Sequence, residues 1–143
     1  MTAASLIRKA TAADQPRIHA IRMGVSENIL SDPSMVTDEE VAWYREQAIF
    51  LVSEEAGEVV GFSCANHQTG LVWALFVDPA HEGRGHGRAL LDAALAALTA
   101  AGIVQAHLTT GAGTRAERFY RRHGWQETGR SLDDHVVFVR PLG

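Results

Sequence analysis

One stretch near the middle of the chain constrains the fold more than any other, because an apolar strand, a glycine-rich turn and a leucine-rich helix follow one another there. Residues 71–77 are almost wholly apolar, which is typical of an interior strand covered on both faces. Pro79 ends this strand, since proline has no N–H to give to a ladder. The helix is indicated by apolar residues at helical spacing: Leu90, Leu91, Ala94, Leu95 and Leu98.

The turn between this strand and this helix holds three glycines at alternate positions, Gly83, Gly85 and Gly87. Without Cβ atoms, glycines let backbone N–H groups approach a ligand closely. The first N–H groups of a helix have no partner within the helix and lie at its positive end. The turn therefore suits an anion, most often a phosphate. A glycine-rich turn that holds no ligand is the alternative interpretation.

Two common phosphate-binding motifs do not fit the turn. No Lys-Ser or Lys-Thr follows Gly87, as a P-loop requires, and the spacing G-x-G-x-G differs from the dinucleotide-binding G-x-G-x-x-G. The stretch instead resembles the acyl-CoA pyrophosphate loop of the GNAT (Gcn5-related) N-acetyltransferase family. That motif is Q/R-x-x-G-x-G/A after a strand that ends in V-D-P. Residues 82–87 read E-G-R-G-H-G, so Glu82 stands where the family has Gln or Arg.

The order of the remaining elements extends this resemblance to nearly the whole chain. The patterns predict strands at 5–10, 50–53, 59–64, 71–77, 103–109, 125–128 and 135–140. They also predict four helices. The first covers 14–25, and the second follows a capping box at Thr37–Glu40. The third covers 85–101 with Gly102 in the C′ position, and the fourth covers 115–123. This is the order of the GNAT fold. The fold class is thus α/β (α+β), a GNAT acyl-CoA N-acyltransferase fold with a mixed central sheet of about 6–7 strands flanked by about four helices.

A second motif agrees with the first. Residues 116–125 read AERFYRRHGW, which resembles the family's A-x-x-x-Y-x-x-x-G-F segment with Trp125 in place of Phe. Family members commonly carry Asn three positions before that alanine, where this chain has Gly113. Thr114 or a backbone group is a candidate to supply the missing contact. Tyr120 matches the tyrosine of the motif, although Tyr120 can also serve simply to pack its helix on the sheet.

The resemblance implies direct acyl transfer from acetyl-CoA to an amine. The pantetheine arm is expected between strands 71–77 and 103–109, and a backbone N–H near Val77 is expected to polarise the thioester carbonyl. Tyr120 is the matching general acid for the departing thiolate. The cofactor-binding residues that the resemblance implies are Leu75, Phe76 and Val77 for the arm, and Arg84, Gly85, His86, Gly87, Arg88 and Ala89 for the pyrophosphate.

Several functional questions stay open at this level. Glu27, His67 and His135 are candidates for a general base, but ordered water serves as well, so none is assigned. The acceptor is either a free small amine or the amine of a peptide or protein. A non-catalytic acyl-CoA-binding sensor on the same fold, and a nucleotide-phosphate binder unrelated to CoA, are the competing interpretations. Sheet edges left open by splayed strands allow a homodimer.

Composition excludes some classes of protein. A chain of 143 residues is expected to form a single domain over residues 1–143. Its net charge of -4 argues against a nucleic-acid binder. With neither an apolar run long enough to span a membrane nor a signal-peptide pattern, we expect a cytoplasmic protein without membrane contact. A single cysteine, Cys64, and the absence of metal-ligand spacing predict that no metal is bound.

Overall fold

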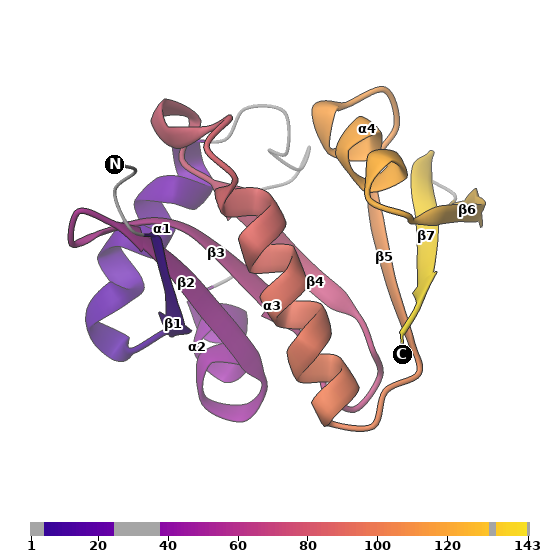
Figure 1. Cartoon of the computed structure of the whole chain (residues 1–143). Coiled ribbons are helices and arrows are strands. Elements are labelled where there is room, and N and C mark those ends of the chain that lie inside the picture. The colour runs from indigo at the N-terminus through magenta and orange to yellow at the C-terminus, as the bar shows by residue number, and fades with distance from the viewer. Residues whose placement is uncertain (1–4, 25–37, 132–133, 143) are drawn as a thin grey trace.

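The computed structural model describes residues 5–24, 38–131 and 134–142. Within them, seven strands form two antiparallel sheets, one with the order β1-β2-β3-β4 and one with the order β5-β7-β6 (Figure 1). The strands are β1 (Ser5–Lys9), β2 (Ile49–Glu55), β3 (Glu58–Ala65), β4 (Val72–Val77), β5 (Gln105–Gly111), β6 (Gln126–Arg130) and β7 (His135–Pro141). Every predicted strand is confirmed, with ends that differ by at most two residues.

Four α-helices within the same residues cover the sheets: α1 (Gln15–Gly24), α2 (Asp38–Gln47), α3 (His86–Ala100) and α4 (Arg115–Arg122). Figure 1 shows α3 across one face of the first sheet, α1 and α2 behind the opposite face, and α4 beside the second sheet. This arrangement confirms the predicted α/β architecture. The helix predicted after the capping box is present as α2, but Thr37, the capping residue, lies outside the described residues.

Two hydrophobic clusters occupy the two faces of the first sheet. The first joins α1 and α2 to the sheet through Ile18, Ile21, Phe50, Phe62 and the fully buried Cys64, among others. The second joins α3 to the second sheet and to α4. It contains Leu91, Leu95 and Leu98 of the predicted helical stripe together with Leu108, Tyr120, Trp125 and Phe138, among others. The periodic leucines therefore pack α3 on the first sheet, in one cluster with core residues of the second sheet.

Both ends of α3 depend on glycine. Gly102 has φ +91°, and the N–H groups of Gly102 and Ile103 donate to the carbonyls of Thr99 and Leu98. These two bonds form the glycine-terminated helix end that the sequence predicts. At the other end the helix begins at His86 rather than at Gly85, because Gly85 adopts the left-handed conformation with φ +88°. Such a backbone turns the chain sharply into the helix and favours glycine.

The two sheets meet at one point and then separate. Within the described residues, one isolated parallel bridge, between Leu71 and His107, links the start of β4 to β5. Beside it the His107 N–H donates to the Gly70 carbonyl at 3.0 Å. Figure 1 shows the two strands diverging from this joint toward their carboxyl ends. The splay implied by the sequence resemblance is therefore present, and it leaves one edge of β4 without a neighbouring strand.

The close packing at this joint predicts that substitution of Gly70 destabilises the protein. Gly70 has φ +84°, and a Cβ there would lie 2.5 Å from the Gln105 carbonyl oxygen. Gly70→Ala should therefore lower the free energy of unfolding in urea by about 3 kcal/mol, from backbone strain and a steric clash. Gly57→Ala is the matched control, because Gly57 has φ +82° but nothing within 4 Å of its Cβ position. That control should lose about 1 kcal/mol, and equal losses would contradict a tightly packed joint.

Candidate active site

The free edge of β4 is shaped by a β-bulge. In the ladder with β3, Cys64 pairs with Ala74 and Ala65 pairs with Val72, so Trp73 is an extra residue in β4. A single extra residue shifts the phase of a strand, and it reverses the direction in which each following residue faces. The bulge therefore decides which main-chain groups of β4 point into the gap between the sheets.

Beyond the bulge, the strand register determines which way the main-chain groups of three predicted site residues face. The Asp78 N–H donates to the Val60 carbonyl at 2.8 Å. Because hydrogen-bonding residues alternate along an antiparallel pair, Phe76 bonds across to β3, while the N–H and C=O groups of Leu75 and Val77 face the gap. The sequence grouped these three residues together. The structure narrows the free backbone groups to those of Leu75 and Val77.

A cleft of about 910 Å³ occupies the space between this edge, the glycine turn and α4. It contains most of the residues that the sequence singled out, and it lies where the two sheets have separated. Its lining comprises Leu75, Phe76 and Val77 from β4; Pro79, His81, Glu82, Gly83, Gly85, Gly87 and Arg88 from the turn and the start of α3; and Arg115, Ala116, Arg118, Phe119, Tyr120, Arg122 and His123 from α4 and its end.

The glycine turn presents helix N–H groups to this cleft. Since α3 begins at His86, the amides of His86, Gly87 and Arg88 have no partner within the helix. The Ala89 N–H is different, because it donates to the Gly85 carbonyl at 3.0 Å. Ala89 was predicted to help hold a pyrophosphate, but its amide is already used inside the helix. The available donors therefore belong to the residues before Ala89.

Gly87 lies where a large side chain would enter the cleft, although a Cβ alone would make only ordinary van der Waals contacts. Its backbone is helical, so no special φ is needed, but a Cβ there would lie 3.7 Å from Val77 and 3.8 Å from Phe119. Val77 is on β4 and Phe119 is on α4, so a side chain at Gly87 would extend between the two walls of the cleft. A glycine here keeps the passage between the walls open.

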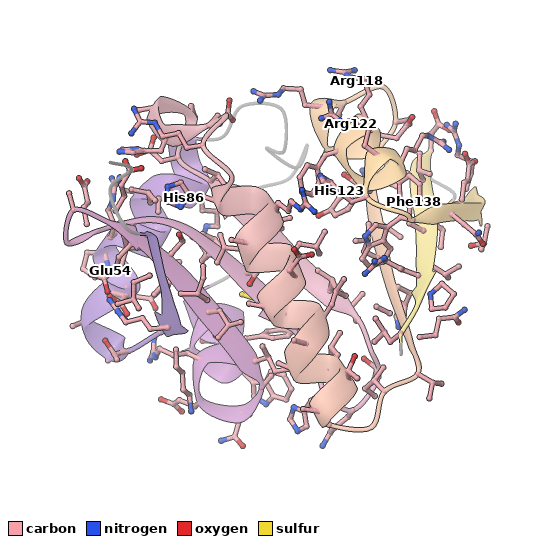
Figure 2. All side chains as sticks on the ribbon, in the orientation of Figure 1. Glu54, His86, Arg118, Arg122, His123 and Phe138 are labelled. Atoms are coloured by element: carbon pink, nitrogen blue, oxygen red, sulfur yellow. The ribbon has the colours of Figure 1, made fainter. Side chains whose placement is uncertain are left out.

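The side chains of His86 and Arg84 point away from the cleft, toward β2. His86 is only 3% exposed, with Nδ1 at 2.6 Å from Ser53 Oγ and Nε2 at 3.3 Å from Glu55 Oε1. Arg84 Nη1 donates to Glu55 Oε2 at 2.6 Å. The His86 hydrogen bond and the Arg84 charge hold the pKa of the Glu55 carboxyl below its usual range. In Figure 2 His86 lies at the start of α3, on the side of the first sheet.

This cluster anchors the turn rather than taking part in chemistry. Ser53, His86 and Glu55 combine the residue types of a hydrolytic triad, but Ser53 is fully buried and none of the three lines the cleft. The contacts instead fix the first residue of α3 on β2. Sequence reasoning missed Ser53 and Glu55, because nothing in their local pattern links them to a histidine more than 30 residues away.

Tyr120 packs its helix on the sheet and also lines the cleft, so its position is compatible with both roles that the sequence left open. Its ring is packed against Phe119, Trp125 and Phe138, with centroid distances of 5.4, 5.6 and 6.1 Å, and the residue is 6% exposed. Tyr120 nevertheless lines the cleft. Burial raises the pKa of its phenol above the ordinary value, so the hydroxyl keeps its proton at neutral pH. The phenol at the wall of the cleft is therefore protonated, although its raised pKa also makes it a weaker acid than an exposed tyrosine.

The start of α4 is fixed by a side-chain cap. The Thr114 hydroxyl accepts from the Glu117 N–H at 3.2 Å and donates to the Gly111 carbonyl at 2.8 Å. Both hydrogen-bonding roles of this hydroxyl are therefore engaged, and neither Thr114 nor Gly113 lines the cleft. The sequence suggested Thr114 as a substitute for the family's asparagine, but the structure uses it to begin the helix.

The rim of the cleft is rich in arginine. Arg88, Arg115, Arg118 and Arg122 all line it, and Figure 2 shows Arg118 and Arg122 on α4 with His123 just after its end. Burial and then the positive charge of Arg88 and Arg122 lower the pKa of His123, which is therefore neutral at pH 7. Clustered positive charge raises the local concentration of an anionic ligand, although the chain as a whole is acidic.

Neither a metal site nor a membrane-spanning helix is found in the part of the chain that the structure describes. No group of three or more His, Cys, Asp or Glu side chains comes together there in a way that would hold an ion. No helix in those ranges has the length and apolar character needed to cross a bilayer.

The fold, the glycine turn and the cleft agree with comparisons to known proteins. Residues 46–127 match the family model described as the acetyltransferase (GNAT) domain, and this span contains both the turn and Tyr120. The chain therefore belongs to the GNAT acetyltransferase family, a class of acyltransferase enzymes.

Two curated relatives are mycothiol acetyltransferases. The one from Propionibacterium freudenreichii subsp. shermanii is 34% identical over 90 residues, which cover 58% of this chain and 29% of that protein. The one from Amycolatopsis mediterranei is 39% identical over 79 residues, which cover 48% of this chain and 26% of that protein. The matched region thus spans less than a third of either relative.

Solved structures share the fold at low sequence identity. A GCN5-related N-acetyltransferase from Rhodopseudomonas palustris has a TM-score of 0.83 at 19% identity, covering 99% of this chain and 98% of that one. The structure of yncA from Salmonella typhimurium with its cofactor acetyl-CoA has a TM-score of 0.80 at 24% identity, covering 98% and 95%. These similarities establish the fold.

Proposed function

We propose that this chain transfers the acetyl group of acetyl-CoA directly to a primary amine of a small molecule or peptide. The observation that carries the proposal is the cleft, where the free edge of β4, the amides at the start of α3 and the protonated Tyr120 face the same space. Membership of the GNAT acetyltransferase family supports the reaction class.

In this proposal the main chain binds the acyl carrier. The amides of the turn and the first turn of α3, from Arg84 to Arg88, donate to the two phosphates of the carrier, at the positive end of the helix dipole. Leu75 offers its unpaired N–H and C=O groups, and Val77 its unpaired C=O group, to the amides of the pantetheine arm, as an adjacent strand would. The arginine-rich rim attracts the carrier's negative charge.

The chemistry needs one oxyanion donor and one acid from the protein. An amine attacks the thioester carbonyl carbon, the C–N bond forms, and the C–S bond breaks. The Val77 N–H donates to the carbonyl oxygen as negative charge develops on it. Tyr120 gives its proton to the departing thiolate sulfur, the attacking nitrogen releases a proton to solvent, and solvent returns a proton to Tyr120. The raised pKa of Tyr120 keeps this proton available at neutral pH.

An assay with a panel of amines tests the proposal. Purified protein is incubated with acetyl-CoA and with amino acids, amino sugars, polyamines or short peptides, while thiol release and product mass are measured. Because both curated relatives are mycothiol acetyltransferases, the panel also includes an amine related to mycothiol. We expect an acetylated amine and stoichiometric free thiol for at least one acceptor.

The competing interpretations give different results in the same experiment. A sensor would bind acetyl-CoA in a calorimeter but acetylate no amine in the panel. A nucleotide-phosphate binder would be stabilised against heat by a nucleotide but not by acetyl-CoA. Either result would contradict the proposed transferase.

A further inference from the structure

An ion pair crosses the cleft between its two walls. Glu82 stands immediately before Gly83 in the glycine turn, and Arg115 is the first residue of α4. The Arg115 guanidinium contacts the Glu82 carboxylate, and both residues line the cleft. These two residues are 33 positions apart in sequence and belong to opposite halves of the molecule. The pair therefore links those halves directly over the space proposed for the acyl carrier.

The carboxylate of Glu82 disfavours the anion binding for which the neighbouring amides are arranged. Glu82 adjoins amides that are oriented to receive an anion, and a negative charge there repels a phosphate. The side chains of Glu82 and Arg115 are 32% and 58% exposed, so water reaches both. An ion pair this exposed contributes little stability, and it opens at small cost. The pair is therefore easily exchanged for a stronger partner.

We propose that Arg115 is a phosphate-binding residue that Glu82 holds over the cleft, and that Arg115 moves from this carboxylate to a phosphate of the acyl carrier when the carrier binds. The guanidinium group fits both partners, because its planar N–H donors match carboxylate and phosphate oxygens alike. A phosphate group in the carrier competes for it from within the same cleft. Glu82 then lowers carrier affinity, both by repelling the phosphate and by retaining Arg115. This inference rests on the proposed function.

A double-mutant cycle measured by titration calorimetry tests the exchange. Dissociation constants for CoA are measured with the wild type, Glu82→Gln, Arg115→Gln and the double variant. Glu82→Gln should tighten binding about fivefold, and Arg115→Gln should weaken it about fivefold in the wild-type background. In the Glu82→Gln background, the loss of affinity caused by Arg115→Gln should reach about twentyfold, because Arg115 no longer has to leave the Glu82 carboxylate. Arg130→Gln removes a positive charge from an exposed pair outside the cleft and should change nothing.

Two outcomes would overturn the inference. If Arg115 only neutralises Glu82, the effect of Arg115→Gln disappears in the Glu82→Gln background. If the pair is merely structural, all four proteins bind CoA equally and differ only in thermal stability. Both outcomes leave the proposed function intact, whereas a wild type that does not bind CoA contradicts the proposed function itself.

A second ligand identifies which phosphate receives Arg115. The same cycle is repeated with 3′-dephospho-CoA, which keeps the diphosphate but lacks the 3′-phosphate. An unchanged Arg115→Gln effect assigns the contact to the diphosphate, and an effect confined to CoA assigns it to the 3′-phosphate. Either result supports exchange onto the carrier.

Discussion

Gly87→Leu should abolish acetyl-CoA binding while leaving the protein folded. A side chain at this position extends between Val77 on β4 and Phe119 on α4, which form opposite walls of the cleft. Leucine would fill the passage that the carrier must occupy, so the dissociation constant should rise at least about 100-fold. The helix itself should gain about 1 kcal/mol, because glycine is a poor helix former. Calorimetry measures the first effect and urea unfolding measures the second.

A control on the same helix separates blocking from a general effect of leucine. Ala96 is an exposed residue of α3 outside the cleft, so Ala96→Leu adds a comparable side chain facing solvent. Its acetyl-CoA affinity should equal that of the wild type. Retained binding by a folded Gly87→Leu variant would mean that the carrier does not pass between β4 and α4, and the proposed cleft would be wrong.

Tyr120→Phe should lower kcat about 100-fold with little change in the KM for acetyl-CoA. The phenylalanine ring keeps the contacts with Phe119, Trp125 and Phe138, so only the proton donor is removed. The chain's other tyrosine provides the control. Tyr44 is buried in the first hydrophobic cluster, outside the cleft, and Tyr44→Phe should keep its kcat. An unchanged kcat in Tyr120→Phe would remove Tyr120 from the mechanism.

The pH profile provides a second readout for Tyr120. An acid acts only while it is protonated, so its contribution is present below its pKa and is lost as the pH rises through that value. Burial raises the pKa of Tyr120, which moves this loss above the ordinary tyrosine value of about 10. The wild-type rate should therefore show no alkaline decline from Tyr120 below about pH 10. A decline near neutral pH that vanishes in Tyr120→Phe would contradict the burial argument.

Local patterns were sufficient to predict the elements of the fold. Apolar periodicity located α3, and its leucine stripe is buried as expected. The positions of glycines predicted the ends of that helix, because a left-handed backbone such as that of Gly102 is usually adopted by glycine. These signals are readable because each depends on a few neighbouring residues.

The direction of the β4 backbone could not be predicted from sequence. An almost wholly apolar strand has no alternation to reveal which residue faces which side, and the extra residue at Trp73 reverses the phase. The sequence therefore grouped Phe76 with Leu75 and Val77, although the main chain of Phe76 belongs to the ladder with β3. A bulge becomes visible only when both paired strands are seen.

Contacts between distant side chains were also beyond sequence reasoning. The partnership of His86 with Ser53, and that of Arg115 with Glu82, each join residues more than 30 positions apart. Charged and polar side chains of these types are usually solvated, so their patterns carry no information about a partner. The fold must be known before such pairs can be recognised.

The joint at Leu71 and His107 also bears on how cooperatively the molecule unfolds. Main-chain bonding between the sheets is sparse in the described residues, so a partial opening of β5, β6 and β7 away from β4 is resisted mainly by the second hydrophobic cluster. A molecule inserted along β4 would contact both sheets and would raise the cost of that partial opening. Such a ligand would add main-chain hydrogen bonds to the side-chain packing that already couples the two sheets.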